Sequence, residues 1–159
     1  MVRVICALAL VLLVACPCFG QQPLVGTWKV VSFETEYQGT GAKEPVLGNN
    51  PVGYTIFTSD GQVASLITAE GLKAPATDQD RAKLTRSMIA YMGRYRIEGD
   101  SFIMKVNVTS MPTWLGTERV LLFHIQGDRL QYTQKEWTDS VLNPERGKMR
   151  TVVTAERVK

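Results

Sequence analysis

The chain has 159 residues, which is enough for one domain with a single apolar core. Its 18 Lys and Arg against 15 Asp and Glu give a formal net charge of +3, too small an excess to indicate a nucleic-acid partner. The single His excludes a multi-histidine zinc site.

The first residues read as a targeting leader. After Met1-Val2-Arg3, the apolar run from Val4 to Ala15 is too short to span a bilayer comfortably. Small residues before Gln21 fit a signal peptidase site, so we predict a signal peptide over residues 1–20 and export, either periplasmic or secreted. Leu13-Val14-Ala15-Cys16 also resembles a bacterial lipobox, and the alternative is a lipoprotein anchored to the membrane through Cys16.

The three cysteines, Cys6, Cys16 and Cys18, all lie within this leader. A chain cut after Gly20 therefore has no thiol for a disulfide, a nucleophile or a Cys-based metal site. We predict that residues 21–159 form one domain stabilised by its core, with no metal and no cofactor. Loss of Arg3 with the leader lowers the formal charge by one, from +3.

The mature chain begins with a strand-like run from Trp28 to Tyr37. Gly26 lies two residues before Trp28, and a flexible glycine ahead of a bulky aromatic residue suits the closed end of a β-barrel. Residues 39–51 are rich in Gly, Pro and Asn and predict a long loop. Two further strands, 54–58 and 62–68, flank Asp60-Gly61, a strong hairpin signal.

The period of the sequence changes between Asp78 and Met92. Apolar and small residues recur there at helical spacing, with Thr77 or Asp78 available as the N-cap and Gly93 just beyond the end. This pattern predicts one short amphipathic helix that covers an end or a flank of the barrel.

Strands return immediately afterwards. The expected runs are 94–98, 102–109, 118–126, 129–137 and 150–158, with tight turns at Gly99-Asp100 and Gly127-Asp128. The eight strands predict an all-β fold, an antiparallel up-and-down β-barrel of about eight strands. Closing the sheet removes the two exposed edges that an open sheet would have.

Four motifs in order carry a family resemblance. They are Leu24-Val25-Gly26-Thr27-Trp28, Pro51-x-Gly53-Tyr54, Ala90-Tyr91-x-Gly93-x-Tyr95 and Pro112-x-Trp114-x-Gly116-Thr117-Glu118. Together they resemble the bacterial and fungal lipocalin-like domain family of calycin-type barrels. The resemblance implies that Arg157 packs across Trp28 as a structural pair beside Gly26. It also implies a small hydrophobic ligand inside the barrel.

The chain departs from the family pattern at two places. Members of this family often have a His in the strand that begins here at Phe102, and an Arg shortly after the Trp-x-Gly-Thr motif. Met104 and Leu121 stand at the corresponding positions, with Arg119 as the alternative counterpart of that Arg. The comparison predicts an apolar pocket without proton chemistry.

Eight residues are candidates for contact with a ligand, and plain core packing is the alternative for each. Five lie on strand faces that could point inward and three lie near the rim: Tyr54, Ile56, Met104, Val106 and Tyr132, then Tyr91, Tyr95 and Trp114. Trp114 is the strongest candidate because it lies in a loop, where aromatic side chains have less packing to do.

We therefore expect an exported barrel that binds a small hydrophobic molecule, with membrane contact only through a lipidated Cys16. Two alternatives stay open. One is an isomerase or cyclase acting on a small apolar substrate in the same cavity, although the sole His, His124, lies mid-strand and the chain has no nucleophile motif. The other is a filled barrel that acts through protein contacts. An apolar cavity of roughly 300 Å³ would favour binding. The oligomeric state is not indicated.

Overall fold

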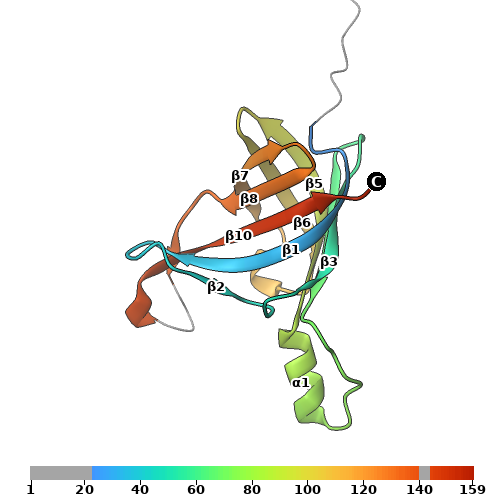
Figure 1. The fold of residues 1–159 in the computed structure, drawn as a ribbon, viewed down its shortest axis with the longest axis vertical. Helices are drawn as coiled ribbons and strands as arrows, with labels where there is room; N and C mark the ends of the chain where they lie inside the picture. The colour runs from blue at the N-terminus through green and yellow to red at the C-terminus, as the bar shows by residue number, and fades with distance from the viewer. Residues whose placement is uncertain (1–22, 140–143) are drawn as a thin grey trace, which may run out of the picture.

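The computed structural model describes residues 23–139 and 144–159. The predicted leader, residues 1–20 with Cys16, lies outside these residues. The described chain forms a closed antiparallel barrel, as the sequence predicts (Figure 1). None of the helices in this described part is long and apolar enough to cross a membrane.

Eight long strands build the barrel. They are β1 (Gly26–Tyr37), β3 (Val52–Phe57), β4 (Gln62–Thr68), β5 (Met88–Glu98), β6 (Ser101–Thr109), β7 (Glu118–Gln126), β8 (Arg129–Gln134) and β10 (Lys148–Arg157). Neighbours pair antiparallel in the order β1-β3-β4-β5-β6-β7-β8-β10, and pairing of β1 with β10 closes the ring. Closure leaves these long strands without a free edge.

Two short strands decorate the ring. β2 (Lys43–Pro45) lies in the predicted loop and pairs with β1, whereas β9 (Thr138–Asp139) pairs with β10. The predicted hairpin turns are confirmed, with Gly61 between β3 and β4, Gly99 between β5 and β6, and Gly127 between β7 and β8. All three glycines have positive φ, as tight hairpin turns require.

The closed end of the barrel is built around Trp28, which is fully buried. The guanidinium carbon of Arg157 lies 4.1 Å from the centroid of the Trp28 ring, and Arg157 donates to the carbonyl oxygens of Val25 (2.8 Å) and Pro23 (3.1 Å). Gly26 has a φ of 138°, and a Cβ on it would lie 2.6 Å from the Arg157 guanidinium. A cation over an indole face contributes on the order of 0.5–2 kcal/mol.

Aromatic side chains continue the core along the interior. Phe57 makes edge-to-face contacts with Tyr95 and Phe102, at centroid distances of 5.1 Å and 5.4 Å. Phe102 in turn contacts Tyr132 at 5.7 Å. These rings, which strand alternation directs inward, fill most of the barrel.

The helix prediction is wrong in its second half. α1 spans Asp78–Arg86 and is capped by Thr77 and Asp80, but residues Met88 to Met92 belong to β5 and pair with β4. No residue of α1 is buried, so the helix does not cover the barrel. It projects from the β4–β5 connection as an arm (Figure 1). Two short 3-10 turns, η1 (Pro112–Trp114) and η2 (Pro144–Arg146), complete the described elements.

Candidate functional site

The barrel interior holds only a small cavity. Its volume is about 20 Å³, which is room for about one water molecule. The expectation of a large interior cavity is therefore wrong in this conformation, because core side chains fill the space. The cavity is lined by Phe33, Tyr91, Met104, Trp114, Arg119, Leu121, Tyr132, Gln134, Thr151 and Val153.

A much larger hollow opens at the mouth of the barrel. Its volume is about 380 Å³, and its lining is mostly apolar. It lies toward the end of β1 and β10 where Tyr37 pairs with Met149, whereas Trp28 and Arg157 pair at the opposite, closed end. The lining residues are Phe33, Thr35, Tyr37, Glu44, Pro45, Val46, Ile89, Met111, Trp114, Met149 and Thr151. We call this hollow the mouth.

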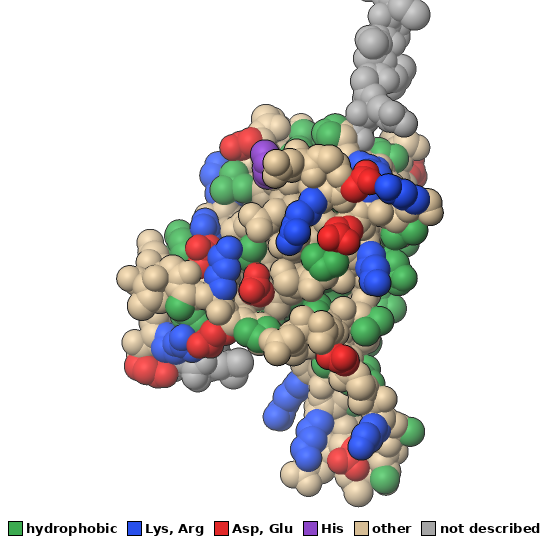
Figure 2. All heavy atoms as spheres, viewed as in Figure 1, with side chains coloured by type: hydrophobic (Ala, Val, Ile, Leu, Met, Phe, Trp, Pro, Cys, Tyr) green, Lys and Arg blue, Asp and Glu red, His purple; other side chains and the backbone are tan. Residues whose placement is uncertain are grey.

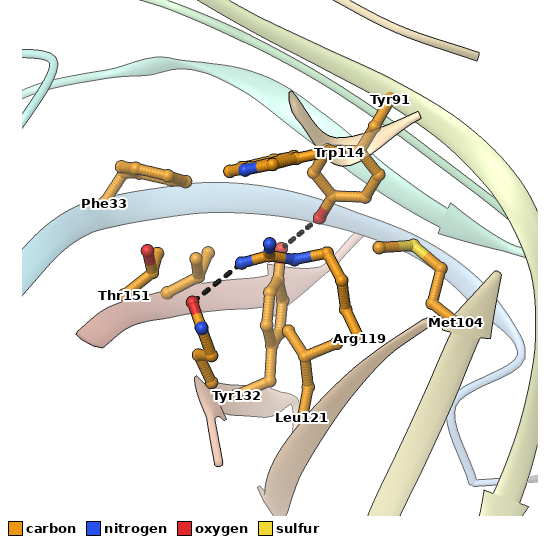
Figure 3. A pocket seen from close by; sticks show the side chains of 10 residues that line it. Phe33, Tyr91, Met104, Trp114, Arg119, Leu121, Tyr132 and Thr151 are labelled. Atoms are coloured by element: carbon orange, nitrogen blue, oxygen red, sulfur yellow. Dashed lines mark hydrogen bonds between the residues drawn. The ribbon is translucent and has the colours of Figure 1, made fainter. Parts of the chain in front are cut away.

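The mouth and the interior cavity adjoin each other. Phe33, Trp114 and Thr151 line both of them. Trp114 lies in η1 between β6 and β7, is half-buried, and packs 6.1 Å from Tyr91 between ring centroids. Its indole therefore forms part of the boundary between the apolar mouth and the inner cavity (Figure 3).

Arg119 brings a positive charge to the inner cavity. It belongs to β7, and its guanidinium carbon lies 4.1 Å from the centroid of the Trp114 ring. One guanidinium nitrogen donates to the side-chain oxygen of Gln134 at 2.7 Å (Figure 3). Burial lowers the pKa of Arg119, because desolvation disfavours the charged form.

A chain of hydroxyl groups crosses the centre of the barrel. The Tyr132 hydroxyl lies 3.3 Å from that of Tyr91 and 3.0 Å from that of Thr55, and Thr55 lies 3.0 Å from Ser65. Burial raises the pKa of Tyr91 and raises that of Tyr132 well above its ordinary value. Both phenols therefore stay protonated at neutral pH and can donate hydrogen bonds, but they cannot serve as bases.

The rim of the mouth is tied together across the sequence. Arg146 of η2 donates to Glu44 at 2.5 Å and stacks over Tyr37 at 3.8 Å from the ring centroid. The hydrogen bond from Arg146 holds the pKa of Glu44 below its usual range. This contact joins η2 to the β2 segment beside the mouth.

Four of the eight candidate residues come together at the inner cavity, namely Tyr91, Met104, Trp114 and Tyr132. Val106 is fully buried and lines neither the inner cavity nor the mouth. Tyr95 lies against Phe57 and Phe102 and donates to the carbonyl oxygen of Thr58 at 3.1 Å, so it packs away from the mouth.

The expected inward orientation of Tyr54 and Ile56 is wrong. Both lie on the outer face of β3, where they are 47% and 42% exposed. Their neighbours Gly53, Thr55 and Phe57 point inward instead, because strand alternation places adjacent residues on opposite faces. Tyr54 and Ile56 border a shallow outer hollow of about 440 Å³ together with Leu66 of β4.

Several residues of the site were not among the predicted ligand contacts, and Arg119 is the most important of them. The alignment by motif spacing assigned the family Arg to the position of Leu121, with Arg119 as the alternative. Arg119 and Leu121 are two residues apart on one strand, so both face the cavity. Arg119 also pairs in register with Met104. The inner cavity is thus polar at one wall, which corrects the expectation of a wholly apolar pocket.

Lys and Arg are interspersed with Asp and Glu on the face over β1 and β10 (Figure 2). Within the described ranges, no group of three or more His, Cys, Asp or Glu residues is placed to hold a metal ion.

A closed up-and-down barrel with one capped end and one apolar mouth is the architecture of small-molecule-binding barrels. The model of the family described as "Lipocalin-like domain" matches residues 25–158, and the chain belongs to this family. Such barrels generally bind small hydrophobic ligands. No curated protein matches the chain in sequence.

Proposed function

We propose that this protein binds a small hydrophobic molecule in the mouth of the barrel, with Trp114 at the inner boundary of the site. The mouth carries the proposal, because its volume of about 380 Å³ falls within the usual range for ligand pockets. A hydrophobic ligand would bind there because its hydrocarbon surface leaves water and contacts apolar side chains, among them Phe33, Val46, Ile89 and Met111. We also propose export, on the strength of the leader-like sequence of residues 1–20.

The mouth is favoured over the deep interior on grounds of space. A cavity of about 20 Å³ accommodates one water molecule but no drug-sized ligand. It is also favoured over the outer hollow at Tyr54 and Leu66, because the large apolar side chains that border that hollow are exposed on the outer face of the sheet. A ligand gains most when a concave site buries the larger part of its surface.

Substitutions that enlarge one side chain test whether the ligand binds in the mouth. Met111 lines the mouth and is 38% exposed, whereas Met92 lies on the outer face of β5 and is 42% exposed. The same change, Met→Trp, at either position adds the same bulk at similar exposure. Met111→Trp should fill the mouth and weaken binding of the neutral dye Nile red at least tenfold. Met92→Trp should leave it within about twofold.

Fluorescence titration of the purified protein with Nile red provides the measurement, with 1-decanol as the competing ligand. Circular dichroism of each variant checks that the fold is retained. Equal dye affinity in the wild-type protein and in Met111→Trp would contradict binding at the mouth. A loss of affinity confined to Met92→Trp would move the site to the outer face.

A further inference from the structure

Arg119 is a half-buried cation without a carboxylate. Arg157 also lacks a carboxylate, but it donates to two backbone carbonyl oxygens, whereas Arg119 donates only to Gln134 among the described residues. Every Asp and Glu side chain of the sequence lies in the described residues, and none forms an ion pair with Arg119. The half-buried Arg150, by contrast, pairs with Glu36 at 2.6 Å. Partly buried charges are usually paired, because desolvation is otherwise costly.

The guanidinium of Arg119 also has unused hydrogen-bonding capacity. An arginine carries five N–H donors in a planar fork. Within the part of the chain that the structure describes, Arg119 makes one hydrogen bond, to Gln134, and one ring contact, to Trp114. The water-sized cavity beside it is also lined by Tyr91 and Tyr132, whose hydroxyls bond to each other; when Tyr132 donates to Tyr91, the Tyr91 O–H is left as a further donor. The cavity is thus built to receive an acceptor atom.

The charge and the surroundings restrict the chemistry of that acceptor. Among the described residues, Arg119 is the only basic one that lines either the inner cavity or the mouth. One cation balances a monoanion, and the planar fork of arginine matches the two oxygens of a carboxylate. The adjoining mouth is mostly apolar and begins at Phe33, Trp114 and Thr151, the residues that the two spaces share.

We infer that the ligand of the mouth is an amphiphilic monocarboxylate whose carboxylate binds Arg119 and whose apolar tail lies in the mouth. This inference rests on the proposed function of the mouth. The carboxylate reaches the guanidinium when Trp114 turns away from it. Trp114 lies in the short η1 turn rather than in a strand, so this movement breaks no sheet pairing. The incoming carboxylate replaces the indole as the partner of the cation.

The test compares three ligands that share one tail: decanoate, 1-decanol and decyl phosphate. Displacement of Nile red gives the three affinities, at a pH where decanoate is ionised and in constant salt. The wild-type protein should bind decanoate at least tenfold more tightly than 1-decanol, the gain expected of a charge-assisted hydrogen bond. Decyl phosphate, which carries more charge than one arginine balances, should bind more weakly than decanoate.

Three variants assign the preference to Arg119. Arg119→Met should remove the preference, so that decanoate and 1-decanol bind this variant with affinities within about threefold of each other. Arg119→Lys keeps the charge without the planar fork and should retain part of the preference. Arg129→Met, at an exposed position on β8, removes the same charge and should retain all of it.

The outcomes separate this inference from the proposed function. If 1-decanol and Nile red bind but decanoate gains nothing, the carboxylate assignment is overturned while binding at the mouth stands. Tighter binding of decyl phosphate than of decanoate also overturns it, as does a preference that survives in Arg119→Met. If none of the ligands binds, the proposed function itself fails. The comparison of the three ligands on the wild-type protein needs no variant. It therefore remains decisive even if Arg119→Met does not fold.

Discussion

Tyr132 joins several strands through one hydroxyl group at the centre of the barrel. Its partners come from β3 and β5, and Phe102 of β6 packs against its ring. Removing the hydroxyl in Tyr132→Phe leaves the hydroxyls of Tyr91 and Thr55 without this partner inside the barrel. We expect a loss of about 1–3 kcal/mol in the free energy of unfolding, measured by urea denaturation at neutral pH.

The buried phenols also predict how stability changes in alkali. Their pKa values are raised in the folded protein by burial, so the unfolded chain loses phenolic protons at a lower pH than the folded chain does. Stability from this source is complete below about pH 10 and falls as the pH rises further. Tyr132→Phe should make this decline shallower in urea titrations across that range.

Individual residues show where sequence reasoning succeeds and where it stops. Strand alternation correctly separates the two faces of β3, but both faces carry apolar or aromatic residues, so alternation does not say which one is inside. The inner face carries Gly53, where a Cβ would collide with the backbone of Ile67, and Thr55, whose hydroxyl bonds to that of Tyr132. Those contacts depend on strands distant in sequence. The contacts of Arg119 with Trp114 and Gln134 could not be predicted either, because they also depend on how separate segments pack together.

Among the elements, β5 depends on close approach of its neighbour β6. Gly93 follows an irregularity in the β5–β6 register, and a Cβ at this position would collide with backbone atoms of Lys105. Gly93→Ala should therefore destabilise the barrel by about 2–4 kcal/mol, since backbone has to move. Gly39→Ala is the control, because a Cβ there meets nothing within 4 Å. Equal midpoints of urea denaturation for the two variants would contradict the expected collision.

The α1 arm is an element that the barrel does not need for its core. Ala69 and Ser87 are joined by a backbone hydrogen bond of 2.8 Å at its base, next to the pairing of Thr68 with Met88. Replacing residues 70–86 by Asn-Gly should give a hairpin whose unfolding free energy differs from that of the full chain by less than about 1 kcal/mol. A much larger loss in urea denaturation would show that the arm stabilises the barrel.

The misassigned end of this helix has a physical explanation. Met88, Ile89 and Met92 satisfy a helical period, yet Ile89 and Tyr91 also satisfy the strand period and are the residues that the structure buries. The choice is made by β4, which offers β5 a ladder of hydrogen bonds from Thr68 to Gln62. Hairpins with Asp-Gly or Gly-Asp turns were predictable because their signal is local. The start of β5 was not predictable from local sequence, because its pairing partner β4 lies on the other side of α1 in the chain.

At the scale of the whole molecule, the two ends of the barrel domain, near Pro23 and near Val158, lie together. Arg157 bonds to the carbonyl oxygens of Val25 and Pro23, and the backbone N–H of Val158 donates to Thr27 at 2.8 Å. A circular permutant that joins Lys159 to Pro23 through a short Gly-Ser linker and opens the chain after Gly71 should fold with native circular dichroism. It should also fold faster in stopped-flow experiments, because β1 and β10 become neighbours in sequence. Failure to fold would mean that the arm tolerates no break.

The same pairing sets the order of events during protein synthesis. β10 is the last strand to leave the ribosome, and until it emerges the nascent polypeptide presents β1 and β8 as open edges that recruit other strands. Truncation before β10 should consequently produce aggregation-prone, chaperone-dependent species rather than a smaller stable domain. The ring becomes self-contained only once β10 has been translated.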